Sequence, residues 1–163
     1  WNGMTRPLDV KAALECSNPY FNNAQVVIVK ADKATDYQTA ESEKGLQFAV
    51  EDGSAGMEQV EALGASYTPV LDQATALLEV SSGTADAAVI DYLMATASVG
   101  EGTSYPDLTY TAELNSEEYG VGFRKGSDLA AELNAFFKAA YADGTMQKIA
   151  DSYGIGDKLI EQK

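Results

Sequence analysis

A carboxylate and a glycine-rich turn are the features of this sequence best suited to holding a small ligand. Asp91 directly follows the apolar run 87–90, and Gly53, Ser54 and Ala55 stand just before a stretch with helical spacing. An ionised carboxylate at the end of a buried strand can accept a charge-assisted hydrogen bond from an ammonium group. The first N–H groups of a helix favour a carboxylate. The two features together would suit a small ligand with one cationic and one anionic group.

Each feature also has a purely structural interpretation. Asp91 could serve as the N-cap of a helix over 92–97, and on the residues alone this interpretation has a weight comparable to ligand contact. The stretch 53–56 could be a simple Gly-Ser turn in which Ser54 caps the helix that follows. From the residues alone, both interpretations stay open for both features.

The composition excludes several classes of protein. There is no histidine, and the single thiol is Cys16, so the usual residues for zinc binding, for Ser-His or Cys-His catalysis and for an internal disulfide are missing. We therefore expect no catalytic residues, no metal and no cofactor. The net charge of −14 would repel phosphate backbones and anionic membrane surfaces, which makes nucleic acid an unsuitable partner. No stretch approaches the roughly 18 apolar residues of a membrane span.

Alternating strands and helices are expected to position these residues. Apolar or β-branched runs followed by turn residues predict strands, and apolar residues at helical spacing predict helices between them. The predicted strands are 25–29, 46–50, 67–71 and 87–90, and the predicted helices are 57–63, ending at Gly64, and 74–80, capped by Asp72. This alternation predicts a mostly parallel, three-layer α/β sheet.

The character of the chain changes after residue 98. Strand-like segments at 108–111 and 119–123 precede a long amphipathic helix over 128–141 and a second helix over 145–153. We expect five aromatic side chains of this region to pack in a core: Tyr119, Phe136, Phe137, Tyr141 and Tyr153. Composition shifts near 26–30 and 119–123 indicate two strands that cross between two lobes and act as a hinge.

Several short motifs, in this order and at these intervals, resemble one known family. They are Trp1–Thr5, Ser17–Phe21, Gly53–Gly56, Gly83–Asp91, Tyr119–Ser127, Ala142–Met146 and Ile149–Gly154. The chain resembles the bacterial periplasmic or lipid-anchored amino-acid-binding proteins, the polar-amino-acid (family 3) branch of the solute-binding superfamily. The resemblance covers essentially the whole chain.

The resemblance implies an α/β, three-layer periplasmic-binding-protein-like clamshell with one complete lobe and part of the second. The first third of the family pattern is absent. On this basis residues 1–25 are expected to belong to lobe one, 26–118 to form lobe two with a hinge strand, and 119–163 to supply the second hinge strand and the C-terminal helices of lobe one. Core surface exposed by the missing part would favour a dimer of this chain.

The family's function implies that the protein binds a small polar solute, an amino acid or an amine, in a cleft between the lobes. It would then deliver the solute to the membrane permease of an ABC importer, outside the cytoplasm, in the periplasm or anchored to lipid at the cell surface. Two other functions carried by the same fold are a dehydratase acting on cyclohexadienyl or arogenate substrates and the sensor domain of a receptor. A dehydratase needs a positioned general acid or base, for which Glu51 and Asp91 are the nearby acids.

The resemblance also assigns individual residues and shows two departures. The family's ammonium-binding aspartate matches Asp91, and Thr5 and Gly3 match a segment that contacts ligand at the edge of the cleft. Val10 stands where the family has an arginine that grips the ligand carboxylate, and Ala55 stands where it has a hydroxyl residue. The carboxylate would therefore depend on amides and on Ser54, or the ligand is a derivative such as an amide or an amine.

Overall fold

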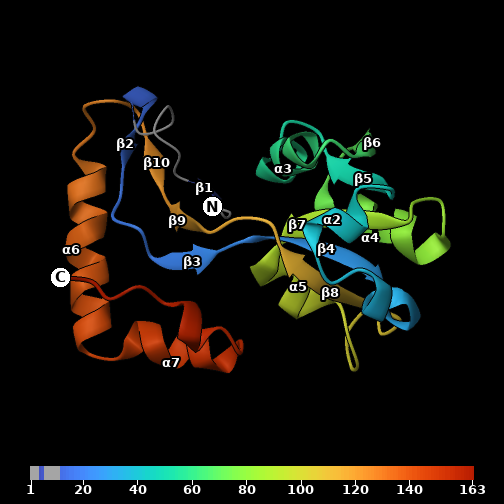
Figure 1. Cartoon of the computed structure of the whole chain (residues 1–163). Coiled ribbons are helices and arrows are strands. Elements are labelled where there is room, and N and C mark those ends of the chain that lie inside the picture. Colours follow the sequence, from blue (N-terminus) through green and yellow to red (C-terminus); the bar gives the residue numbers. More distant parts are fainter. Residues whose placement is uncertain (1–3, 6–11) are drawn as a thin grey trace. The chain divides into compact units, whose positions relative to one another are not determined.

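The chain forms two compact units, seen in a computed structural model that describes residues 4–5 and 12–163 (Figure 1). Unit 2 is the continuous stretch Ala24–Ser116, and unit 1 combines the chain before it with Glu117–Lys163. The sequence predicts the inserted lobe over 26–118, and unit 2 starts and ends two residues earlier.

Unit 2 is built on a five-stranded sheet in the order β6-β5-β7-β4-β8. Its strands are β4 (Gln25–Lys30), β5 (Gln47–Glu51), β6 (Ser66–Val70), β7 (Ala87–Asp91) and β8 (Leu108–Glu113). β5 pairs in parallel with β6 and β7, whereas β4 pairs antiparallel with both β7 and β8. Four strands therefore run in one direction, as the mostly parallel prediction requires, and β4 alone is reversed. No helical crossover links β4 to either of its neighbours in the sheet, so nothing forces it to run parallel to them.

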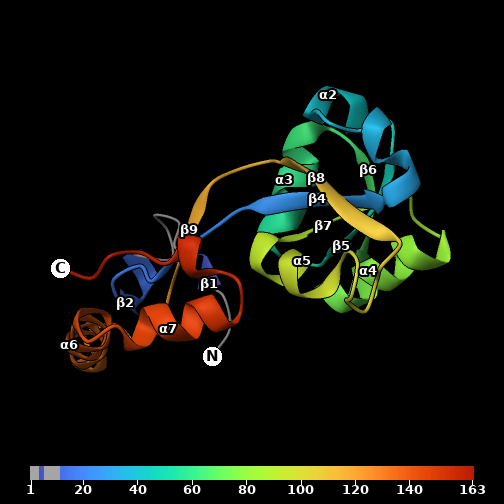
Figure 2. The same cartoon turned by 90° about the horizontal axis from the view of Figure 1, so that it is seen from below.

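Helices cover both faces of this sheet. They are the 3₁₀-helix η1 (Ala31–Asp36) and the α-helices α2 (Ala40–Glu43), α3 (Ala55–Leu63), α4 (Gln73–Ser82) and α5 (Tyr92–Ser98). Alternate residues of β4 point to opposite faces, so Val26 and Ile28 pack with α4 and α5, whereas Val27 and Val29 pack with α3. Figure 2 shows α2 and α3 on one side of the sheet and α4 and α5 on the other. The predicted three-layer α/β architecture is confirmed.

The two helices that flank the candidate site lie within about two residues of their predicted ranges, 57–63 for α3 and 74–80 for α4, and have the predicted residues Gly64 and Asp72 at their limits. The Asp72 carboxylate accepts a hydrogen bond of 2.7 Å from the Thr75 N–H and so caps α4. Gly64 follows α3 with φ of 73°, a left-handed conformation that glycine adopts without steric cost. Local sequence thus sets the starting points of helices that tertiary packing then places.

Unit 1 contains two small antiparallel sheets and the C-terminal helices. The sheets have the orders β1-β9-β3 and β10-β2. The elements are β1 (Met4–Thr5), β2 (Glu15–Cys16), β3 (Phe21–Asn23), β9 (Glu117–Gly120), β10 (Gly122–Phe123), α6 (Leu129–Ala142), α7 (Thr145–Ser152) and η2 (Gly156–Lys158). Across the described ranges, no helix combines the length and apolar character needed to cross a membrane.

The aromatic packing expected in unit 1 is only partly correct. Tyr119 and Phe137 are buried, and the Tyr20 ring lies 5.6 Å from that of Phe137, centroid to centroid. Phe136 is 62% exposed and Tyr153 is 77% exposed, so their predicted core positions are wrong. Adjacent residues of a helix point about 100° apart, so Phe136 cannot share the inner face with Phe137. Tyr153 lies at the C-cap of α7, past its last regular turn.

Candidate ligand-binding site

The candidate binding residues of unit 2 gather at one edge of its sheet. β5, β6 and β7 are parallel, so their carboxyl ends meet at the same edge, where ligands of open α/β sheets collect. After β5 comes the turn Gly53–Ala55, after β6 comes Gln73, and β7 itself ends at Asp91. The reversed strand β4 begins at this edge, with Gln25 directly opposite Asp91. The topology therefore brings four distant parts of the sequence together.

The Asp91 carboxylate is bound by a side-chain amide at each oxygen. Gln25 Nε2 donates a hydrogen bond of 2.7 Å to Oδ1, and Gln73 Nε2 donates one of 2.7 Å to Oδ2. The Asp91 N–H in turn donates to Gln73 Oε1 at 3.1 Å. The carboxylate is half-buried. A carboxylate offers about four lone-pair sites, so each oxygen can accept a further donor such as an ammonium group.

The capping interpretation of Asp91 is wrong. The residue occupies the N-cap position of α5, but its side chain makes no capping hydrogen bond. The first N–H of that helix, from Tyr92, instead donates to the Ala24 carbonyl at 2.8 Å. The carboxylate of Asp91 thus faces the edge of the sheet and its two glutamines.

The turn after β5 is both a helix cap and a set of hydrogen-bond donors. Gly53 has φ of 69°, and Ser54 Oγ accepts a hydrogen bond of 3.1 Å from the Met57 N–H. The capping interpretation of Ser54 is therefore confirmed. An accepting hydroxyl still carries its own proton, so Ser54 can donate to an anion at the same time. The N–H groups of Ala55 and Gly56 stand in the first turn of α3, which has no intrahelical acceptors for them.

Removal of this cap gives a first testable prediction. The substitution Ser54→Ala is expected to lower the free energy of unfolding by about 1 kcal/mol, because the Met57 N–H loses its acceptor. Chemical denaturation of the full chain measures the change. Ser152→Ala is the matched control, since that hydroxyl only donates to the Ile149 carbonyl within α7, and its effect should stay below about 0.5 kcal/mol. Equal losses from both variants would contradict a capping role for Ser54.

The two glutamines are functional candidates that sequence reasoning missed. The sequence predicts Gln25 at the start of the strand 25–29 and Gln73 just before the helix 74–80, with no site role for either. No local pattern in the sequence identifies Gln25, because the pairing that places it opposite Asp91 joins segments far apart in the chain. Asp72, next to Gln73, accepts hydrogen bonds from the Thr75 N–H and hydroxyl, which lower the pKa of Asp72 below its ordinary value. These bonds fix the start of α4 and with it the position of Gln73.

The remaining predicted site residues belong to unit 1. Thr5 lies in β1, opposite Tyr119 of β9, and is half-buried. Gly3, assigned to the ligand site, and Val10, the departure from the family arginine, lie outside the described residues. Of the predicted set, the structure therefore brings together Gly53, Ser54, Ala55 and Asp91.

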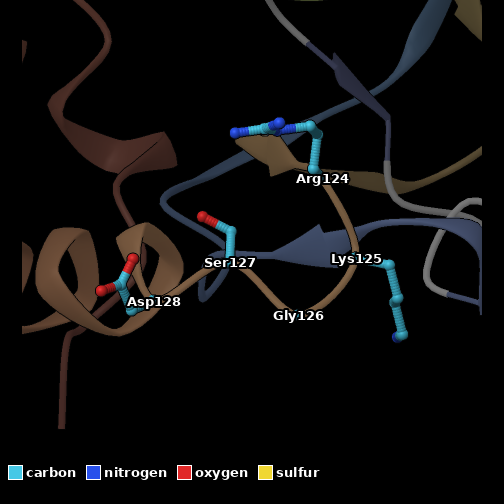
Figure 3. A pocket seen from close by; sticks show the side chains of 5 residues that line it. All are labelled: Arg124, Lys125, Gly126, Ser127 and Asp128. Atoms are coloured by element: carbon cyan, nitrogen blue, oxygen red, sulfur yellow. The ribbon is translucent and has the colours of Figure 1, made fainter.

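A pocket in unit 1 has a different character. It is lined by the loop Arg124–Asp128, and Figure 3 shows the side chains of Arg124 and Lys125 pointing in different directions. The loop is held to its own unit, because the Gly126 N–H donates to Glu15 Oε2 at 3.2 Å and Lys125 Nζ to the Leu14 carbonyl at 3.4 Å. The two cationic side chains diverge, and Lys125 already binds a backbone carbonyl, so this loop does not define a ligand site. Within residues 4–5 and 12–163, no three acidic or thiol side chains are grouped to hold a metal ion.

Unit 2 is a three-layer α/β unit that is inserted into unit 1 through two chain crossings. Its polar residues lie at the carboxyl edge of the sheet. These features define the class of periplasmic-binding-protein-like folds. The family model for "Bacterial extracellular solute-binding proteins, family 3" matches residues 1–156. The chain belongs to this family.

Solved structures of amino-acid-binding proteins are also similar to this chain in sequence and fold. A variant of ArgBP from T. maritima has 30% sequence identity and a TM-score of 0.82 over 93% of this chain and 66% of its own. An ancestral amino-acid-binding protein, a precursor of cyclohexadienyl dehydratase, has 26% identity and a TM-score of 0.82 over the same shares. An ancestral arginine-binding protein bound to arginine has 27% identity and a TM-score of 0.79, over 93% of this chain and 69% of its own. The chain thus spans about two thirds of the length of these structures. A search of curated proteins gave no match.

Proposed function

We propose that this protein binds an amino acid at the carboxyl edge of the unit 2 sheet, with the Asp91 carboxylate as the acceptor for the ligand's ammonium group. The observation that carries the proposal is the placement of Asp91 and the first turn of α3 at the ends of adjacent parallel strands. The edge thus presents an anion and the backbone donors of a helix N-terminus, which match the two charged groups of a zwitterion.

The ligand carboxylate would be bound by the N–H groups of Ala55 and Gly56 and by the Ser54 hydroxyl. Ala55 offers only its backbone amide, so this half of the site depends on the helix terminus. Neutral donors at a helix terminus bind a carboxylate less strongly than an arginine fork. We therefore expect the interaction with the ammonium group to contribute the larger share of the affinity.

L-Arginine is the first ligand to test. Two of the similar structures are an ancestral amino-acid-binding protein and an ancestral arginine-binding protein bound to arginine, and a third is a mutant of arginine-bound ArgBP. The net charge of −14 also favours the approach of a cationic amino acid over an anionic one.

The substitution Asp91→Asn tests the proposal. It removes the negative charge, and an asparagine can accept a hydrogen bond at only one of the two atoms that Gln25 and Gln73 now address. Loss of a charge-assisted hydrogen bond of 1.5–3 kcal/mol corresponds to an affinity for L-arginine lower by roughly 10- to 150-fold. Isothermal titration calorimetry of the full chain against L-arginine and a panel of amino acids and amines measures it.

Asp86→Asn is the matched control for that experiment. Asp86 precedes the other end of β7, is exposed, and its carboxylate accepts a hydrogen bond of 3.0 Å from the Gln47 N–H. This variant should bind like the wild type, because the change lies at the opposite edge of the sheet. The proposal fails if the wild type binds no member of the panel, or if Asp91→Asn binds as tightly as Asp86→Asn.

The wider role follows from the family. We infer that the protein captures a solute outside the cytoplasm and passes it to the membrane permease of an ABC importer without turning it over. The dehydratase alternative is named by one relative, the ancestral precursor of cyclohexadienyl dehydratase. Incubation with prephenate separates the two functions, since a binding protein leaves prephenate unchanged.

The dimer expected for this chain is a separate prediction. Analytical ultracentrifugation tests it by measuring the mass of the protein in solution.

A further inference from the structure

Gln25 and Gln73 bind the Asp91 carboxylate from two different elements. Gln25 comes from the first residue of β4 and Gln73 from the first residue of α4, and each amide reaches a different carboxylate oxygen at 2.7 Å. Gln73 also accepts from the Asp91 N–H, so it fixes the side chain and the backbone of Asp91 together. Rotation of the carboxylate about its last bond would break at least one of these contacts.

Both the backbone and the side chain of Gln25 are fixed by contacts. It is only 2% exposed, its N–H donates to Asn115 Oδ1 at 2.7 Å, and its carbonyl accepts from the Leu114 N–H at 2.8 Å. Its side-chain Oε1 lies against Gly56, where a Cβ atom would come within 3.0 Å of it. A buried glutamine with its backbone and side chain both engaged has one conformation, so it presents its Nε2 to Asp91 in a fixed direction.

The chemistry of these donors suits recognition of a cation. Amide N–H groups bind a carboxylate without neutralising it, whereas a lysine or arginine in the same place would cancel its charge. Fixing the plane of the carboxylate before the ligand arrives removes an ordering cost from binding. The two glutamines therefore leave the charge of Asp91 in place and set the direction of its lone pairs.

We propose that Gln25 and Gln73 are positioning residues that orient the Asp91 carboxylate for the ammonium group of the ligand. This inference rests on the proposed amino-acid binding at Asp91. Neither glutamine needs to touch the ligand, because each acts through Asp91.

The test uses Gln73→Met, which keeps the length of the side chain and removes its donor and acceptor. Gln73 is the better site for the substitution because it is half-buried, and Gln25→Met is the second variant. The affinities for L-arginine and for its deamino analogue, δ-guanidinovalerate, are measured by calorimetry on the full chain. We expect Gln73→Met to weaken L-arginine binding about tenfold and to leave the analogue unchanged, because only L-arginine carries the ammonium group.

Gln47→Met is the matched control. Gln47 Nε2 donates to Thr68 Oγ1 at 3.2 Å near the opposite edge of the sheet, so the same chemical change there should alter neither affinity. A double-mutant cycle measures the coupling between Gln73 and Asp91 in L-arginine affinity, which a general structural role of Gln73 would not produce. In an Asp91→Asn background, Gln73→Met should cause no further loss of L-arginine affinity, since its effect passes through the carboxylate.

Three results would overturn the inference. They are an unchanged L-arginine affinity in Gln73→Met, an equal loss for L-arginine and for the deamino analogue, and additive losses in the double-mutant cycle. If Asp91→Asn weakens binding while Gln73→Met does not, amino-acid binding at Asp91 stands and the positioning role fails. If Asp91→Asn has no effect, the proposed function fails, and the positioning role fails with it.

Discussion

Replacing Glu43 by glutamine is expected to stabilise the protein at neutral and alkaline pH and to have almost no effect in acid. Glu43 is the last residue of α2 and its side chain is completely buried. Its Oε1 lies 3.0 Å from the Thr111 hydroxyl, and no hydrogen-bond partner for its Oε2 is found in the described part of the chain. Burial of a carboxylate with an unsatisfied oxygen penalises its charged form.

The pKa of Glu43 follows from this environment. Burial raises it above the ordinary value of 4.5, and hydrogen bonds from the Thr111 hydroxyl and the Ala112 backbone offset part of that effect. A group whose pKa is raised on folding contributes stability that is fully present below its unfolded value and is lost as the pH rises through its folded value. Between the unfolded and the folded pKa the folded protein holds the Glu43 proton at a cost in free energy, and above the folded pKa it contains a buried charge.

A glutamine needs no proton to stay neutral, so Glu43→Gln should raise the free energy of unfolding by roughly 1–3 kcal/mol near pH 8 and by almost nothing near pH 4. Urea denaturation at both pH values measures the two differences. Glu41→Gln is the matched control on the same short helix, because Glu41 is exposed and forms a surface ion pair with Lys44, which contributes little to stability. A stabilisation by Glu43→Gln that is equal at both pH values would contradict the argument.

Replacing Gly56 by alanine is expected to destabilise unit 2 and to weaken ligand binding in the same variant. A Cβ atom at this position would lie 3.0 Å from Gln25 Oε1 and 3.2 Å from the Val89 carbonyl, and neither neighbour can move freely. Val89 belongs to the central part of the sheet, and Gln25 is fixed by Asn115, Leu114 and Asp91. Overpacking of this kind costs about 1–3 kcal/mol.

The measurement compares Gly56→Ala with Gly45→Ala by chemical denaturation and by calorimetry with L-arginine. A Cβ atom at Gly45 would meet nothing within 4 Å, so the control should change stability by no more than about 1 kcal/mol, in the stabilising direction. Gly56→Ala should also lower the affinity, because the displaced Gln25 no longer holds Asp91 in place. If the two variants behave alike, the close packing of Gly56 on Gln25 has no energetic consequence.

The sequence by itself determined most strands and helices of unit 2 to within about two residues. Alternating apolar runs and helical spacing predicted the strands and helices of unit 2, because burial on two faces and capping by Ser54 and Asp72 are local properties of the chain. The order of short motifs was sufficient to predict the family. Asp91 and the turn at Gly53–Ala55 were selected from sequence because strand ends and helix starts can be read from neighbouring residues.

Only the tertiary structure decided which side chains meet. The reversed direction of β4 places Gln25 opposite Asp91, and no local pattern carries that information because the two residues are far apart in the sequence. The start of α4 after β6 places Gln73 at the same carboxylate. Whether Asp91 caps α5 depended on where the first N–H of that helix finds its acceptor, and Ala24 supplies it from a distant segment. The burial of Glu43 and the exposure of Phe136 were likewise set by packing between elements, which periodicity within one helix does not fix.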